Sequence, residues 1–142
     1  MRENGTERVT GSAQQRAEGV KQLEILAPAG WINSNQRLHR MQVAKLTAAW
    51  REAARVRVPG SWAPAVGPVR VVAEVWKPRR GRYDPGNLYP TAKAVLDGIV
   101  DAGLLSDDDW LHVVGPDMRH GGIGPAALVV KIYPANALSV LV

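Results

Sequence analysis

Acidic and basic residues gather between Arg79 and Asp109 in a pattern that could do chemistry. An isolated carboxylate, Asp84, precedes an expected helix that carries Lys93, and three successive aspartates follow that helix. These three are Asp107, Asp108 and Asp109. Carboxylate oxygens are the ligands that Mg²⁺ prefers, and a nearby lysine can stabilise developing negative charge. The combination predicts a hard-cation site beside a polyanion, which is what metal-assisted hydrolysis of a phosphodiester requires.

Arginines lie just before Asp84 and near the start of an earlier expected helix. They are Arg79, Arg80 and Arg82 in the first group, and Arg37 and Arg40 in the second. The first group would grip flanking phosphates, which gives salt-dependent affinity without reading bases. The second group, with His39, could meet phosphates with help from the helix dipole. A solvated loop and a solvated first turn are the respective alternatives, and a solvated turn is also the alternative for the three aspartates.

Other enzyme classes find little support in the residues. The chain has no cysteine, which excludes disulfides, Cys-ligated zinc and thiol catalysis. Its three histidines lack the spacing of a zinc hydrolase, and each is explained more simply as a surface or loop residue. No G-x-S-x-G, P-loop or G-x-G-x-x-G motif occurs.

Length and composition indicate one globular domain. A chain of 142 residues with 46% hydrophobic residues can bury a core, and a net charge of +5 favours an anionic partner such as nucleic acid. No apolar run approaches a membrane span, and the N-terminus lacks the apolar core of a signal peptide, so we expect a cytoplasmic protein and no membrane partner. Residues 1–20 are expected to be a mobile tail, 21–134 the domain and 135–142 a C-terminal tail.

Hydrophobic periodicity places the elements in the order strand, helix, strand, helix, strand, strand. We expect strands at 23–27, 69–76, 110–114 and 127–133, and an amphipathic helix at 38–55. A loop fills 56–68, and a glycine-rich turn fills 117–125. This order predicts an α+β fold in which two helices cover a small mixed sheet.

Pro90 limits where the second helix can begin. A start at Pro85 would put Pro90 in the second turn, at a cost of about 3 kcal/mol. Asn87 is therefore expected as the N-cap, which leaves Asp84 in the preceding loop. On this helix Lys93 and Asp97 have the spacing of a surface ion pair, and Gly103 is expected to end the helix.

Three blocks of sequence resemble the RusA-type Holliday-junction resolvases. That family has a basic run followed by Asp-x-Asp-Asn-Leu, then a helix with a lysine shortly before an aspartate, then a glycine, two apolar residues, any residue and Asp-Asp before a strand. The similar blocks are Arg80–Leu88 (RGRYDPGNL), Lys93–Asp97 (KAVLD) and Ala102–Asp108 (AGLLSDD). The resemblance extends from about Leu23 to Pro134.

The resemblance implies a homodimeric, Mg²⁺-dependent endonuclease that cuts branched DNA such as four-way junctions, with Mn²⁺ as a possible substitute ion. By position, Asp84 matches the first metal aspartate and Lys93 the catalytic lysine. Asp107 and Asp108 match the acidic pair, so the implied catalytic and metal-binding acids are Asp84, Asp107 and Asp108.

Two departures from the family pattern stand out. Gly86 occupies the place of the second aspartate, and three more residues separate Asn87 from Lys93 than in the shorter family version. Asp109 is a further acid that could compensate. Two alternatives to the enzyme therefore remain open, a protein that binds junctions without cutting them and a small basic scaffold protein.

Overall fold

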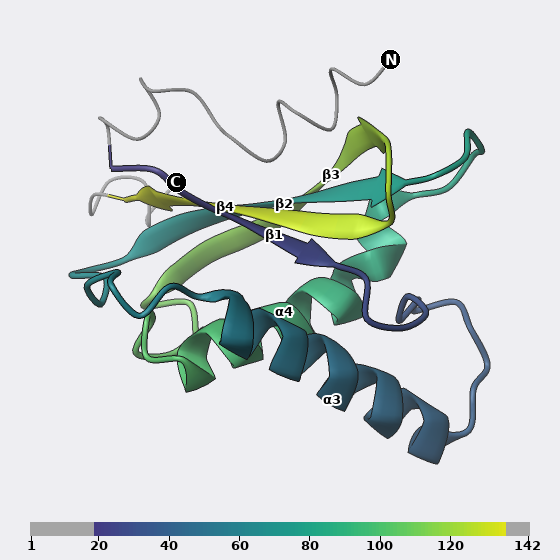
Figure 1. The fold of residues 1–142 in the computed structure, drawn as a ribbon, viewed down its shortest axis with the longest axis horizontal. Helices are drawn as coiled ribbons and strands as arrows, with labels where there is room; N and C mark the ends of the chain where they lie inside the picture. The colour runs from purple at the N-terminus through teal and green to yellow at the C-terminus, as the bar shows by residue number, and fades with distance from the viewer. Residues whose placement is uncertain (1–18, 136–142) are drawn as a thin grey trace.

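A four-stranded mixed sheet is the frame of the fold, and the computed structural model describes residues 19–135. The strands are β1 (Lys21–Leu26), β2 (Val69–Lys77), β3 (Val113–Ile123) and β4 (Ala127–Pro134). They lie in the order β1-β4-β2-β3, with β4 antiparallel to both neighbours and β2 parallel to β3. Two helices, α3 (Arg40–Arg57) and α4 (Tyr89–Asp101), cover one face of the sheet (Figure 1).

The core lies between the sheet and these helices. Alternate residues of β2 are buried, as expected for a strand with one face on a core. These are Val69, Val71, Ala73 and Val75. The two helices approach closely at Gly98, where an added Cβ would lie 2.1 Å from the carbonyl oxygen of Arg51. Trp50 is fully buried at this layer, and its indole N–H donates to the Gly30 carbonyl at 2.9 Å.

The predicted fold class is confirmed: the chain is α+β, with a small mixed sheet covered by two main helices. The first helix begins at Arg40 and ends at Arg57, two residues later at each end than expected. His39 explains the start, because its Nδ1 accepts a hydrogen bond from the Met41 amide at 3.1 Å. The tails predicted at 1–20 and 135–142 fall almost wholly outside the described residues.

The prediction for β3 was wrong. The expected short strand at 110–114 and the expected turn at 117–125 are replaced by one strand, Val113–Ile123. Gly115 and Pro116 do not end it, because β3 is an edge strand and the pair sits at an irregularity in its register with β2. There the partners of Arg70 and Val72 are Val114 and Asp117, so β3 has one extra residue at this bulge.

The prediction for the start of the second helix was also wrong in detail. Asp84 caps a short 3₁₀ helix, η1 (Pro85–Leu88), by accepting a hydrogen bond from the Gly86 amide at 2.9 Å. Asn87 therefore lies inside η1, and α4 begins at Tyr89 with Pro90 in its first turn. The end of the helix agrees with expectation, since Gly103 follows with a φ of +86°.

Among the residues that the structure describes, no helix is long and apolar enough to cross a membrane.

Candidate functional site

Lys93 on α4 contacts two carboxylates. Its ammonium lies 2.9 Å from Oδ1 of Asp97, one helical turn later, and 2.5 Å from Oδ2 of Asp108. Asp108 belongs to the segment that joins α4 to β3. We call Lys93, Asp97 and Asp108 the Lys93 cluster. The expected Lys93–Asp97 ion pair is present, and Asp108 adds a contact across fifteen residues of sequence.

The segment after α4 is held in place by its apolar residues. Gly103 turns the chain, and Leu104 and Leu105 are both buried in the core. The carbonyl of Leu104 also accepts a hydrogen bond from the Ala65 amide at 2.8 Å. This anchoring fixes the start of the acidic triple beside α4, and it explains why Asp108 can reach Lys93.

The three successive aspartates have different partners. Asp107 accepts a hydrogen bond from the Asp108 amide at 2.7 Å, so it shapes the turn that presents Asp108. Asp109 accepts from the Leu111 amide at 3.2 Å and lies 2.5 Å from Nδ1 of His112. Asp109 therefore stabilises the turn before β3, and these hydrogen bonds are to residues outside the Lys93 cluster.

Ion pairing holds the charges of the Lys93 cluster in place. The hydrogen bond to Asp108, helped by Asp97, raises the pKa of Lys93 to about 12. The same hydrogen bond from Lys93 lowers the pKa of Asp108 below its usual value. The Asp108 side chain is only 17% exposed, whereas that of Lys93 is 45% exposed. At neutral pH the cluster thus presents a shielded carboxylate and an accessible ammonium.

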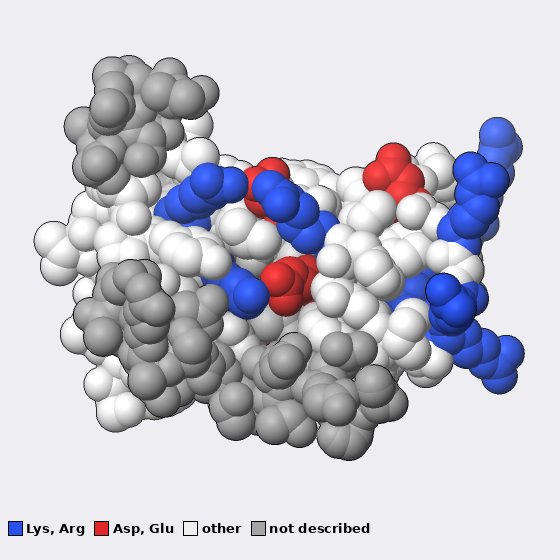
Figure 2. Space-filling view, turned by 90° about the horizontal axis from the view of Figure 1, so that it is seen from above, with Lys and Arg blue, Asp and Glu red and all other residues white. Residues whose placement is uncertain are grey.

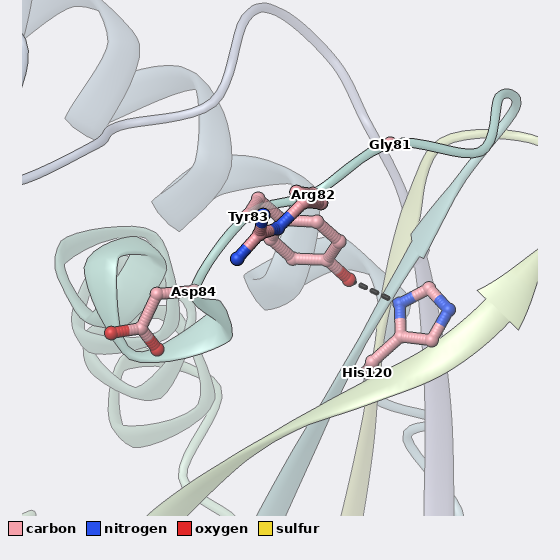
Figure 3. A pocket seen from close by; sticks show the side chains of 5 residues that line it. All are labelled: Gly81, Arg82, Tyr83, Asp84 and His120. Carbon is pink, nitrogen blue, oxygen red and sulfur yellow. Dashed lines mark hydrogen bonds between the residues drawn. The ribbon is translucent and has the colours of Figure 1, made fainter.

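Asp84 lies apart from the Lys93 cluster. Its carboxylate is exposed and lines a cavity of about 530 Å³ together with Gly81, Arg82, Tyr83 and His120. Figure 3 shows the Asp84 carboxylate on the side of this cavity away from His120. No hydrogen bond or ion pair joins it to the Lys93 cluster within residues 19–135. The structure thus unites Lys93 with Asp108 and leaves Asp84 and Asp107 outside that contact.

The predicted ligands supply the type of donor atom that a hard divalent cation prefers. All three predicted ligands supply carboxylate oxygens, and Asp97 adds another beside Asp108. The carboxylates of Asp97 and Asp108 face one cation-sized position, which the Lys93 ammonium occupies. In the described part of the chain, no three acidic or histidine side chains come together as a metal-binding group.

The predicted phosphate-binding arginines are exposed. Arg79, Arg80 and Arg82 project from the turn between β2 and η1, and Figure 2 shows Lys and Arg side chains gathered at that end of the molecule. Arg37 and Arg40 lie at the start of α3, at the same end of the ribbon (Figure 1). The chain before them is tied to η1, because the Ser34 amide donates to the Asn87 carbonyl at 2.8 Å.

Three residues at the site were missed by sequence reasoning. Asp97 was interpreted only as a surface partner, although its i,i+4 spacing to Lys93 was the available signal. Tyr83 and His120 were not linked, because His120 was assigned to a turn and is on β3. The Tyr83 hydroxyl hydrogen-bonds Nδ1 of His120, and burial raises the pKa of Tyr83.

Comparison of the chain with protein-family models and with curated protein sequences gives no match in either case.

Proposed function

We propose that this chain is a metal-dependent endonuclease that hydrolyses phosphodiesters in branched DNA, as the resemblance to the RusA-type resolvases implies. One observation supports the proposal above the others: the Lys93 ammonium contacts Oδ2 of Asp108 at 2.5 Å. These residues belong to two separate blocks of the resemblance, and the fold brings them into one site. A lysine beside a shielded carboxylate suits chemistry on a phosphate anion.

Each side chain has a role in this proposal. Asp84 and Asp108, helped by Asp107, would hold one or two Mg²⁺ ions, or Mn²⁺ in their place. When bound, the ion would lower the pKa of a water and neutralise charge on the phosphate. Lys93 stabilises negative charge on the reacting phosphate, and Asp97 keeps its ammonium on the side of α4 that faces Asp108. Asp97 is thus a positioning residue.

DNA binding in this proposal relies on the exposed arginines at one end of the molecule. Arg79, Arg80 and Arg82 contact phosphates near the cut, and Arg37 and Arg40 contact the backbone further along. Such contacts give affinity that falls steeply with salt and carries no base sequence information. A homodimer in the cytoplasm completes the proposal, because two-fold symmetry suits a four-way junction with two symmetry-related cuts.

Gly86 favours a second candidate, a protein that grips junctions without cutting them. It removes one carboxylate that the resemblance implies, and the nearest acid, Asp84, uses Oδ1 to cap η1. In the same site Lys93 already neutralises Asp97 and Asp108. A weakened metal site with intact arginines would leave binding and remove hydrolysis.

A cleavage assay on a synthetic four-way junction distinguishes these candidate functions. The full chain is incubated with labelled junction in the presence of Mg²⁺, in parallel with a linear duplex. Symmetric nicks that appear only in the junction support the endonuclease. Retarded but intact junction supports the binding protein, and neither nicks nor retardation supports a scaffold protein that does not act on DNA.

A further inference from the structure

The cavity beside Asp84 contains a pair of residues that the proposed hydrolysis does not use. Tyr83, in the turn before η1, and His120, on β3, come together through a hydrogen bond between the phenol oxygen and Nδ1 (Figure 3). Their rings meet edge to face, with centroids 5.5 Å apart. His120 is therefore held from two sides, by its strand and by Tyr83.

The hydrogen bond leaves the second ring nitrogen of His120 available. When the Tyr83 hydroxyl donates to Nδ1, the neutral imidazole carries its proton on Nε2, which can then donate to a ligand. In the protonated ring Nε2 also donates. An exposed histidine fixed in this way offers a directed N–H group at the edge of the cavity.

Two cations that form no ion pair in the described part of the chain lie at or near the same cavity. Arg82 lines it, and the Lys77 ammonium lies 4.1 Å from the centroid of the Tyr83 ring. Within residues 19–135, neither side chain forms an ion pair. Other basic residues of the described chain do pair, as Arg51 does with Asp101 and Arg70 with Asp117. The Asp84 carboxylate also lines the cavity, on the side away from His120 (Figure 3), and within residues 19–135 it forms no ion pair with Arg82 or Lys77.

We propose that the cavity lined by Arg82, Tyr83 and His120 binds a phosphate group of the nucleic-acid backbone next to the bond that is cut. A guanidinium, an ammonium and an imidazole N–H match the several acceptor oxygens of a phosphate. A stacked base fits less well, because Lys77 already covers the Tyr83 ring and His120 meets its edge. The inference rests on the proposed function for its choice of nucleic acid as the source of the phosphate.

Binding of a small phosphate ligand tests this directly. The full chain, free of metal, is titrated with thymidine 3′,5′-bisphosphate and separately with inorganic phosphate while the imidazole signals are followed by NMR. We expect the His120 signals to shift on saturation and those of His39 and His112 to stay unchanged. The variant His120→Gln assigns the signals.

Two exposed or partly exposed positions supply variants that keep the fold. Tyr83→Phe removes only the hydroxyl that holds His120, and it should weaken bisphosphate binding about two- to tenfold. Arg82→Gln should weaken it by a comparable or larger factor, because it removes a charged donor. Arg55→Gln is the matched control, because Arg55 pairs with Glu52 on α3 and does not line the cavity. This variant should bind the bisphosphate as tightly as the parent chain does.

The outcomes separate this inference from the proposed function. A shift at His39 or His112 with His120 unmoved, or equal affinities in all variants, would overturn the phosphate site. Binding of inorganic phosphate without binding of the bisphosphate would overturn the nucleic-acid source. Bisphosphate binding in a chain that never cuts a junction would uphold the site and contradict the endonuclease. Undiminished junction cleavage by His120→Gln and Arg82→Gln would uphold the endonuclease and contradict the phosphate site.

Discussion

Lys93 is the residue on which the candidate site depends. Sequence spacing was enough to expect it on a helix and to pair it with Asp97, because positions four apart share a helix face. Its contact with Asp108 could not be derived from spacing, since that contact depends on the turn at Gly103 and the burial of two leucines. The family resemblance grouped Lys93 with Asp108, whereas periodicity alone did not.

Replacement of Gly86 by aspartate tests the missing carboxylate. An added Cβ at Gly86 would lie 3.2 Å from Oδ1 of Asp84, so the new carboxylate would stand beside that of Asp84 after a small adjustment. We expect Gly86→Asp to lower the melting temperature without metal, because like charges repel, and to raise it when Mg²⁺ is added. Cleavage at limiting Mg²⁺ should rise about tenfold, since each metal-site group changes affinity or activity on that scale.

The matched control for Gly86→Asp is Gly60→Asp. Gly60 lies in the loop before β2, where nothing approaches an added Cβ within 4 Å. The variant Gly60→Asp therefore adds the same charge away from the site. If both variants respond to Mg²⁺ in the same way, the place of the missing ligand is already filled or the site does not bind metal.

At the level of elements, strong periodicity predicted β2 and α3 well, whereas the Gly-Pro pair at Gly115 did not mark the end of a strand. The alternating apolar residues of β2 and the apolar face of α3 predicted the ends of both elements to within two residues. Gly115 and Pro116 predict the end of a strand, because both residues normally interrupt strands. Pairing with β2 overrides them, since an edge strand can bulge where a proline lacks its N–H. That override is a tertiary effect, and it is what places His120 beside Tyr83.

The link between α4 and the acidic turn should be measurable as a coupling free energy of unfolding. In a double-mutant cycle of Lys93→Met and Asp108→Asn, we expect a coupling of about 0.2–1 kcal/mol at neutral pH, because Lys93 is nearly half exposed and solvent screens the pair. Urea unfolding of the four proteins measures it.

The pH dependence of this coupling follows from the two pKa shifts. The pKa of Asp108 is lowered, so its contribution is present above its usual value of 3.8 and is lost as the pH falls through the lowered value. The pKa of Lys93 is raised from 10.5 to about 12, so its contribution is present below 10.5 and is lost as the pH rises through about 12. If the coupling persists at a pH below both the usual pKa and the lowered pKa of Asp108, the Lys93–Asp108 pair is not what joins these segments.

The contact between α3 and α4 gives a stability prediction of its own. Gly98→Ala would gain about 1 kcal/mol of helix propensity, yet its Cβ would meet the Arg51 carbonyl at 2.1 Å and Ala54 at 2.9 Å. Separation of the helices to relieve this overlap costs about 3 kcal/mol. We expect a net loss of about 2 kcal/mol in the free energy of unfolding, measured in urea. A more stable Gly98→Ala protein would contradict this helix packing, and Gly60→Ala serves as the neutral control.

For the whole molecule, the Lys93 cluster and the exposed arginines are two separate features, and their joint action is a proposal. The Lys93 cluster lies between α4 and the turn before β3, and the arginine turn projects from the far end of β2. Charge and composition predicted an anionic partner, but no amount of periodicity identifies DNA, a junction or a second copy of the chain. Those assignments come from three short blocks of resemblance and need an activity measurement.

Asp108→Asn in a junction assay tests whether Asp108 takes part in the hydrolysis of DNA. The parent chain, Asp108→Asn and the control Asp101→Asn are compared for Mg²⁺-dependent nicking and for retardation of the same four-way junction. Asp101 is a suitable control because it also pairs with a cation, Arg51 on α3, and is not a member of the Lys93 cluster. We expect Asp108→Asn to cut at least about a hundredfold more slowly and to retard the junction as before, while Asp101→Asn cuts normally. Cleavage by Asp108→Asn at the parent rate would contradict a metal-binding role for Asp108.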